Sequence, residues 1–267
     1  MRFVNPYRKK SQEVMKNWFF ATGLMLTLFA QTLMGVAQDE KPLIPESVYD
    51  EMLMWMVDGK YEKVLYKAIR YTEEEATSKE PRPYVFMAEA YFRISQSDDA
   101  VLKTKYPNAL KDALKYAVKF RKKDKDDQYF AQYMEFINAL RRAAMNEAEA
   151  MVDEEKFAKA KGMYKYLYDL DAEDPGAWIM YGSVLWKAKA TRDAQEAWAV
   201  AEKLLTEQGG KGLQPIQLDL LKYAIIYTAE QLEAAGDNAG ALRWVQLAGP
   251  LFEKDKEFTA VKRSIGG

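Results

Sequence analysis

The amino-acid sequence predicts an all-α protein, an α-solenoid of about four to five stacked antiparallel helix pairs closed by a C-terminal capping helix. Apolar residues recur every three or four positions along most of residues 38–267, as they do on the buried face of a helix. Short turns interrupt this periodicity, and small residues recur where two helices would cross. We therefore expect one helical-repeat domain over residues 38–267.

The composition allows a large core and removes several kinds of chemistry. Hydrophobic residues make up 49% of the 267 residues, and basic and acidic residues nearly cancel to a formal net charge of -1. Such a balance gives no field that would attract nucleic acid or anionic lipid. Histidine and cysteine are both absent, so a Ser-His triad, a zinc site of these ligands and a disulfide are excluded. We expect no enzyme activity, no cofactor and no metal.

Residues 1–37 are typical of a secretory signal peptide. An apolar run from Trp18 to Ala30 is followed by small residues at Gly35-Val36-Ala37, which signal peptidase requires before its cut. The run is preceded by basic residues, namely Arg2, Arg8, Lys9, Lys10 and Lys16. We expect cleavage between Ala37 and Gln38 and export to the periplasm.

Two alternatives remain open for this region. Residues 18–37 are nearly long enough to span a membrane as an uncleaved anchor, although Gln31 and Thr32 interrupt them. The segment from Met15 would itself begin a conventional signal, so either Met1 or Met15 is the true start. A signal followed by Gln38, in a chain without cysteine, resembles exported proteins of Bacteroidota.

Four helices are expected before residue 125. The first two are separated by a turn at Asp58-Gly59-Lys60, and their stripes hold Val48, Met52, Trp55 and Met56, then Tyr61, Val64, Leu65, Ala68 and Tyr71. The third helix starts at Pro81 and Pro83, and its partner carries Ala113, Ala117 and Phe120. Between them, residues 95–107 form an insertion that a repeat of helix pairs does not require.

The next pair opens with an unusually long helix. Its pattern runs from about Asp127 to Met151, which at about 1.5 Å per residue reaches beyond an ordinary repeat helix. The partner helix follows Phe157 and carries Ala160, Tyr164 and Leu167. A short junction at residues 170–175 leads into the central unit.

The stretch from Asp174 to Glu207 is the most regular part of the chain. Its first helix carries Trp178, Gly182 and Leu185, and its second carries Ala194, Trp198 and Ala201. Large residues form a ridge and small ones leave a hole, so the two helices can pack closely. The stretch resembles the tetratricopeptide repeat (TPR) family, which implies a right-handed superhelix whose grooves bind peptides or helices.

The last pair follows a flexible link containing Gly209, Gly210 and Gly212. Pro215 opens its first helix, and Gly236-Asp237 makes the turn. The second helix carries Ala241, Val245 and Ala248. Pro250 is expected to start the final, capping helix.

The spacing of the positions where paired helices would cross tests whether the chain has the period of a TPR. Val64, Ala113, Ala160, Ala194 and Ala241 are separated by 49, 47, 34 and 47 residues. Only one interval is the 34 of a TPR. The other intervals require longer helices or longer loops. A HEAT-like or another array of helical pairs therefore remains open.

Two short segments match ligand-binding loops only in part. Residues 169–173 alternate acids as a calcium loop does, but Asp174 and Met180 stand where glycine and glutamate are needed. Residues 209–212 contain Lys211 between glycines but lack the Ser/Thr of a phosphate loop. We predict neither a calcium site nor a phosphate site.

The resemblance implies that the first helix of each pair lines a concave groove for a protein partner. The residues expected there are Tyr91, Arg93, Met145, Glu149, Val152, Ser183, Trp186 and Lys187. The Lys/Asn set with which some TPRs bind a C-terminal carboxylate is missing, because Ile179, Ser183 and Lys187 occupy those positions.

Two functions are therefore considered. The first is an exported scaffold that binds envelope proteins, as part of a secretion or cell-surface assembly. The second is a solute- or glycan-binding helical-repeat protein, as in SusD-like proteins, which are longer and normally anchored through a cysteine. An open groove of mixed polarity would favour the scaffold, and an enclosed aromatic pocket would favour solute binding.

Overall fold

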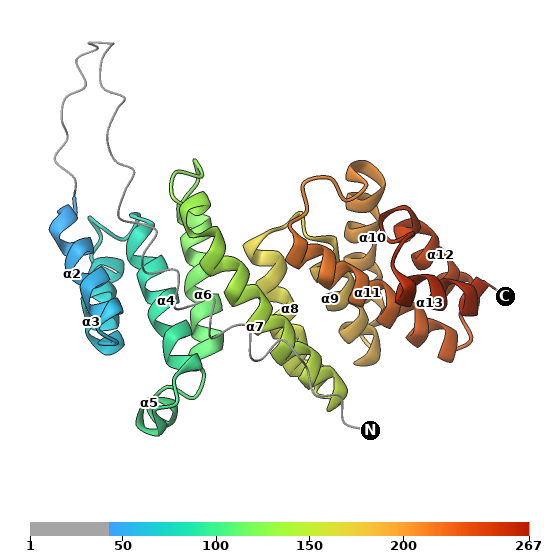
Figure 1. The fold of residues 1–267 in the computed structure, drawn as a ribbon, viewed down its shortest axis with the longest axis horizontal. Coiled ribbons are helices and arrows are strands. Elements are labelled where there is room, and N and C mark those ends of the chain that lie inside the picture. Colours follow the sequence, from blue (N-terminus) through green and yellow to red (C-terminus); the bar gives the residue numbers. More distant parts are fainter. Residues whose placement is uncertain (1–42, 267) are drawn as a thin grey trace, which may run out of the picture. The chain divides into compact units, whose positions relative to one another are not determined.

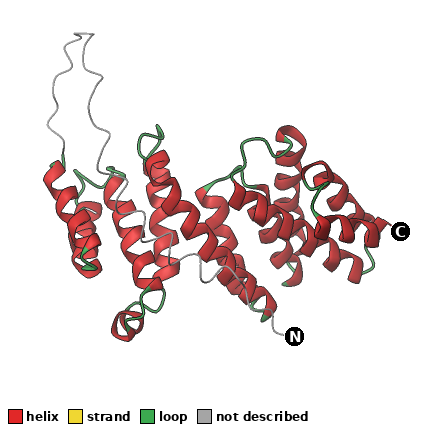
Figure 2. Ribbon diagram, in the orientation of Figure 1, coloured by secondary structure: helices red, strands yellow, loops and turns green. Residues whose placement is uncertain are grey.

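A computed structural model describes residues 43–266, which belong to one compact unit, Leu43–Gly267. Within this range the chain is helical and has no strand (Figure 2), which confirms the prediction of an all-α chain. The helices follow one another along the chain (Figure 1) as α2 (Glu46–Val57), α3 (Tyr61–Glu73), α4 (Arg82–Gln96), α5 (Ala100–Lys105), α6 (Ala109–Lys123), α7 (Met134–Asp153), α8 (Phe157–Leu170), α9 (Pro175–Lys187), α10 (Thr191–Gln208), α11 (Pro215–Ala234), α12 (Asn238–Ala248) and α13 (Lys256–Gly266).

Neighbouring helices pack against each other throughout this unit. The most extensive associations are those of α4 with α6, α9 with α10, α3 with α4, α11 with α12 and α8 with α9. Other contacts skip one helix, since α9 also packs on α11, α6 on α8 and α10 on α12. Each central helix is therefore covered by several partners.

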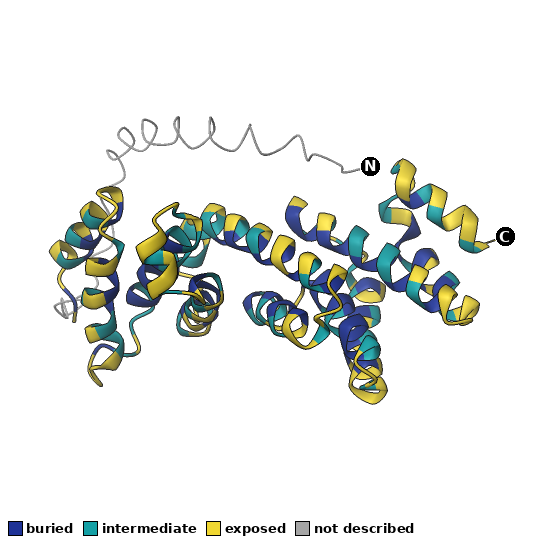
Figure 3. Ribbon diagram, turned by 90° about the horizontal axis from the view of Figure 1, so that it is seen from below, coloured by how far each residue is buried: buried dark blue, intermediate teal, exposed yellow. Residues whose placement is uncertain are grey.

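The predicted small positions all lie in the core. Val64, Ala113, Ala160, Ala194 and Ala241 are each 0% exposed. Individual helices carry a buried stripe on one side and exposed residues on the other (Figure 3), as their apolar periodicity requires. The positions that the sequence assigns to helix crossings are thus used for close packing.

Gly182 explains why one of these crossings needs a glycine. A Cβ atom placed on Gly182 would lie 2.5 Å from Cδ1 of Trp198 and 3.0 Å from the carbonyl oxygen of Ala194. The indole Nε1 of Trp198 donates to the carbonyl of Ile179 at 3.1 Å. The tryptophan is therefore held across the glycine, and α9 and α10 approach closely.

A buried ion pair that sequence reasoning missed connects three helices. Nη1 of Arg141, on α7, lies 2.5 Å from Oδ2 of Asp174, and the two side chains are 4% and 0% exposed. Nη2 of Arg141 donates to the carbonyl of Leu167, on α8, at 3.5 Å. Oδ1 of Asp174 accepts the backbone N–H of Ala177 at 3.2 Å and so caps α9. The pair fixes where α9 begins against α7 and α8.

The long helix begins later than its pattern predicts. The structure has a 3₁₀ turn at Phe130–Tyr133, and α7 starts at Met134 rather than near Asp127. Oδ2 of Asp124 accepts the backbone N–H groups of Tyr129 at 3.0 Å and Phe130 at 2.7 Å. This carboxylate holds the preceding loop and stops the helix from extending backward, although α7 still has 20 residues.

Two further segments differ from the sequence-based prediction, and in both a carboxylate caps the start of a helix. The insertion contains a short helix, α5, whose first turn is capped by Oδ1 of Asp99, an acceptor for the N–H of Val101 at 2.8 Å. Pro250 lies in a 3₁₀ turn, and α13 starts only at Lys256. There Oδ1 of Asp255 accepts the N–H of Phe258 at 3.0 Å. Side-chain caps, rather than apolar periodicity, decide these boundaries.

The signal peptide, its cleavage after Ala37 and the start at Met15 lie outside the described residues. Among the helices of residues 43–266, none has the length and apolar character needed to cross a membrane.

Candidate functional site

A groove of about 880 Å³ opens between the insertion and the facing parts of α7 and α8. We call it the insertion groove. One wall comes from the end of α4 and from residues 103–111, and the other from residues 143–151 of α7 and 158–166 of α8. Its lining is mixed, and includes Lys103, Leu110, Lys111, Glu147, Lys159 and Tyr166.

The wall formed by the insertion is anchored to α3. The hydroxyl of Tyr106 donates to Oε1 of Glu62 at 2.9 Å, and Nζ of Lys105 pairs with the same oxygen at 2.6 Å. Hydrogen bonds from Lys105 and Tyr106 lower the pKa of Glu62, so the carboxylate stays charged and keeps both partners. The insertion is therefore held in one position beside the groove.

Tyr91 supports the same wall from within. Its ring stacks on Tyr116 with centroids 5.6 Å apart and meets the edge of Tyr106 at 5.9 Å. Arg93 lies on the same helix and pairs with Glu89, one turn earlier, at 3.5 Å. The two α4 residues predicted for a binding surface thus lie outside the lining of the insertion groove.

The other six predicted residues lie on α7 and α9, and three of them are packing residues. Met145, Val152 and Ser183 are 6%, 5% and 2% exposed. The Ser183 hydroxyl donates to the carbonyl of Ile179 at 2.8 Å and lies 2.6 Å from the hydroxyl of Thr228. These side chains join α7, α9 and α11 and are not accessible to a partner.

Trp186, Lys187 and Glu149 are partly exposed. The Trp186 ring lies against Trp198 with centroids 6.5 Å apart. Nζ of Lys187 donates to Oε1 of Gln231, on α11, at 2.8 Å. Two of these residues therefore contribute to packing between helices, whereas Glu149 belongs to a separate group of titratable side chains.

This group, which we call the carboxylate–tyrosine cluster, consists of Glu149 and Asp153 on α7, Tyr164 on α8, and Tyr223 and Tyr227 on α11. Burial raises the pKa of Glu149 from its ordinary 4.5 to about 7, and the charge of Asp153 adds to this rise. The rings of Tyr223 and Tyr227 stack with centroids 6.0 Å apart and planes 21° apart.

The pKa values of the three tyrosines are raised above the ordinary value. Burial raises the pKa of Tyr223, and Glu149 and then Asp153 raise it further. Burial likewise raises the pKa of Tyr227 to about 12, with a contribution from Asp153. The three tyrosines were missed from the sequence, although the i, i+4 spacing of Tyr223 and Tyr227 indicates one shared helix face.

The acidic segment at residues 169–173, for which no calcium site is predicted, makes contacts within the protein. Asp169 pairs with Nζ of Lys165 at 2.7 Å, and Oδ2 of Asp171 accepts Nε2 of Gln217 at 2.9 Å. In the described part of the chain, no group of three or more acidic side chains is arranged to hold a metal ion.

No protein-family model matches this chain, and no curated protein matches its sequence. The site is therefore interpreted from its own residues and their contacts.

Proposed function

We propose that this protein is an exported TPR-like scaffold that binds a segment of an envelope protein. The insertion groove is the observation that carries this proposal. An open groove of this size with mixed lining suits a peptide segment, because apolar side chains can be buried while backbone groups find polar partners.

The TPR-like, right-handed arrangement is part of the same proposal. It is supported by the five fully buried small positions and by the contacts that skip one helix, as in a stack where each pair rests on the next. Export to the periplasm rests on residues 1–37 alone.

The charge of the groove indicates what kind of segment would bind. Lys103, Lys111 and Lys159 are exposed in its lining, and Glu147 is the acidic residue among them. Leu110 and Met163 supply apolar surface between these charges. We therefore expect the bound segment to combine acidic and apolar side chains.

A crosslinked affinity pull-down of the full exported protein from its native envelope tests this proposal. The test variant is Lys111→Glu/Lys159→Glu, which reverses two charges in the groove. The matched control is Arg192→Glu/Lys203→Glu, which reverses two exposed charges on α10. We expect the same envelope proteins to be retained by the native chain and the control and lost from the groove variant.

Proteins retained equally by both variants would overturn the groove as the binding surface. Retention of a glycan without any protein would instead favour the solute-binding function. Thermal melting of both variants checks that any loss of binding does not come from unfolding.

A further inference from the structure

Helix α6 carries a row of lysines that extends beyond the insertion groove. Lys111, Lys115, Lys119 and Lys123 are each four residues apart, so each lies about 6 Å further along nearly the same side of the helix. The first three are exposed and the fourth is half-buried. We call this row, which is about 18 Å long, the lysine stripe.

The lysines of the stripe have no acidic partner among residues 43–266. None of the four belongs to an ion pair there, whereas Arg121, on the same helix, pairs with Asp127. Like charges at this spacing on a helix repel each other. Burial lowers the pKa of Lys119, and the charges of Lys115 and Lys123 lower it further. The stripe is therefore a concentration of unpaired positive charge.

Tyrosine rings, rather than carboxylates, contact these ammonium groups. Nζ of Lys115 and Nζ of Lys119 lie 5.4 Å and 5.1 Å from the ring centroid of Tyr116. Nζ of Lys123 lies 5.6 Å from the ring centroid of Tyr84. These cation–π contacts hold three positive charges along one side of α6.

The same rings are already engaged and offer little to a stacked ligand. The ring of Tyr116 stacks on Tyr91 with centroids 5.6 Å and planes 7° apart, and it also carries the two lysine contacts. Tyr84 is only 5% exposed. Stacking of bases or sugar rings needs exposed aromatic faces, so the stripe suits recognition by charge instead.

The stripe is continuous with the insertion groove. Lys111 lines the groove, while Lys115 and Lys119, further along α6, lie outside its lining. Leu110 and Met151 supply apolar surface within the groove. A chain that lies in the groove can therefore continue over the stripe.

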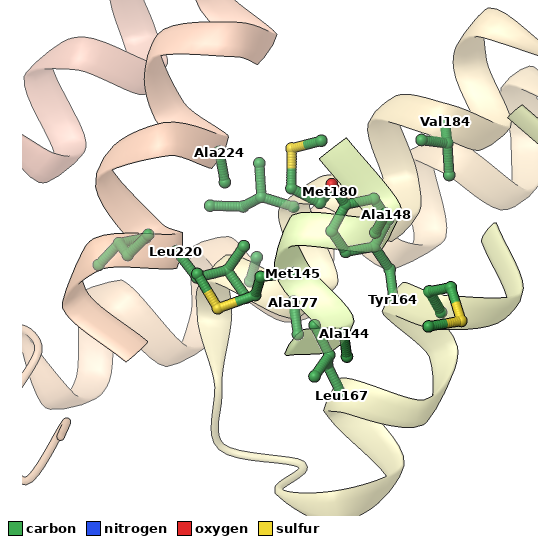
Figure 4. Packing of buried hydrophobic residues seen from close by; sticks show 14 of the residues in the cluster. Ala144, Met145, Ala148, Tyr164, Leu167, Ala177, Met180, Val184, Leu220 and Ala224 are labelled. Atoms are coloured by element: carbon green, nitrogen blue, oxygen red, sulfur yellow. The ribbon is translucent and has the colours of Figure 1, made fainter. Parts of the chain in front are cut away.

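Core packing fixes the groove and the stripe in position. Behind the groove, Ala144 and Ala148 of α7 lie with Leu167 of α8 in one buried cluster, as Figure 4 shows. On α6, Ala113 and Ala117 belong to the same cluster and are 0% exposed. Both surfaces are thus formed before a partner binds, which lowers the cost of binding.

We propose that the lysine stripe binds an acidic tract of the partner segment whose apolar residues lie in the insertion groove. The inference rests on the proposed function of the groove, but the pairing with acidic residues belongs to α6 alone. Acidic side chains about 6–7 Å apart, at i, i+4 on a helix or i, i+2 on a strand, match the spacing of the lysines. A protein is favoured over an acidic polysaccharide because the adjoining groove presents apolar surface.

Fluorescence anisotropy of the full exported protein with labelled octaglutamate tests the stripe, with octaglutamine as the neutral probe of the same length. We expect octaglutamine to bind at least about tenfold more weakly than octaglutamate. Lys115→Gln/Lys119→Gln should lower the affinity for octaglutamate about fivefold. The matched control, Lys256→Gln/Lys262→Gln, removes two exposed lysines of α13 and should change this affinity by less than about twofold.

A second probe separates the stripe from the groove. It joins Leu-Ala-Leu-Ala to either end of octaglutamate, and the tighter of the two versions should bind about tenfold more tightly than octaglutamate, because its leucines are buried in the groove. Gly162→Phe fills the groove, since nothing lies within 4 Å of a Cβ atom at this lining residue. This variant should abolish the gain and leave the affinity for octaglutamate unchanged.

Unchanged affinity for octaglutamate in Lys115→Gln/Lys119→Gln, or equal binding of octaglutamine, would overturn the stripe as a binding surface. Tighter binding of polygalacturonate than of octaglutamate would assign the stripe to an acidic polysaccharide and would also overturn the proposal. If octaglutamate binds as expected but the apolar extension adds nothing, the proposed function of the groove fails, whereas the acidic site on α6 stands. Melting temperatures of the variants check that each remains folded.

Discussion

The N-terminal helices and the central helices are held together in different ways. One apolar cluster contains residues of α2, α3, α4 and α6. The second begins with residues of α4 and α6 and continues through α7 to α13. In the central region, fully buried side chains and the Arg141–Asp174 pair join successive helices. At the N-terminal end, a partly exposed arginine makes the main polar connection between α2 and α4.

That arginine is Arg82, at the start of α4. Its Nη1 pairs with Oε1 of Glu46 on α2 at 2.7 Å, and its Nε donates to Oε1 of Glu80 at 3.1 Å. The guanidinium also lies over the ring of Tyr49 at 3.8 Å. Because Glu46 is largely exposed, water and salt compete with this connection. We therefore expect α2 to open locally well before the central helices do.

The largest effect is expected for Arg141→Met. Removing the guanidinium leaves the carboxylate of Asp174 buried without its partner, which should cost about 3–5 kcal/mol of unfolding free energy. Thermal and denaturant unfolding measure this loss. The control is Arg142→Met, whose side chain is 60% exposed and pairs with Asp219 at 3.7 Å. It should change stability by less than about 0.5 kcal/mol, and similar losses in both variants would contradict the role of the buried pair.

The next effect concerns two glycines inside helices. Gly182→Ala places a Cβ atom against the indole of Trp198 and should destabilise by about 1–3 kcal/mol. Gly162→Ala is the matched change on α8, where nothing lies within 4 Å of the added atom, so the better helix propensity should stabilise by about 0.5–1 kcal/mol. Opposite shifts in denaturation midpoint are expected. Shifts of the same sign would count against close packing of α9 and α10.

Arg82→Met should cost about 1–2 kcal/mol, since it removes the ion pairs with Glu46 and Glu80 and the stacking on Tyr49. The informative measurement is hydrogen exchange resolved along the chain. Protection should fall in α2 and α3 and stay unchanged in α9 and α10, because the central core does not contain this arginine. Loss of protection in both regions would indicate that the two unfold as one unit.

The smallest effect is the pH dependence of stability caused by Glu149. Its pKa in the folded protein is about 7, above the ordinary 4.5, so the folded state binds the proton more tightly than the unfolded state does. The contribution of this group to stability is therefore lost as pH rises from about 4.5 to about 7. Glu149→Gln should be more stable than the native chain by about 1 kcal/mol near pH 8 and equal to it near pH 4. Melting temperatures across this range test the sign.

Most helices could be predicted because the information they need is local. The three- and four-residue spacing of apolar residues identifies every long helix between residues 46 and 248, and the small positions mark where helices cross. The predicted starts of two helices are wrong, because in each case a side chain caps the turn before the helix. Asp124 delays α7 and Asp255 delays α13, and neither carboxylate changes the apolar pattern.

The exposure of the residues predicted for a binding groove could not be read from the sequence, for a different reason. The resemblance to TPRs places residues on a helix face, but it does not say how closely the next helix covers that face. Ser183 lies under Thr228 of α11, and Met145 and Val152 are buried beneath neighbouring helices. Glu149 alone among the predicted residues lies in the carboxylate–tyrosine cluster.

Local sequence therefore determines that this chain is helical and where most of its helices lie. It also determines which residues are small enough for another helix to pack closely against them. The tertiary structure decides which exposed and buried groups come together. Tyr164 and Tyr227 are 63 positions apart in the chain, and residues of the insertion groove come from five helices and one loop. Such neighbours depend on how long each helix is and at what angle it packs, which are set by side-chain contacts summed over the whole core.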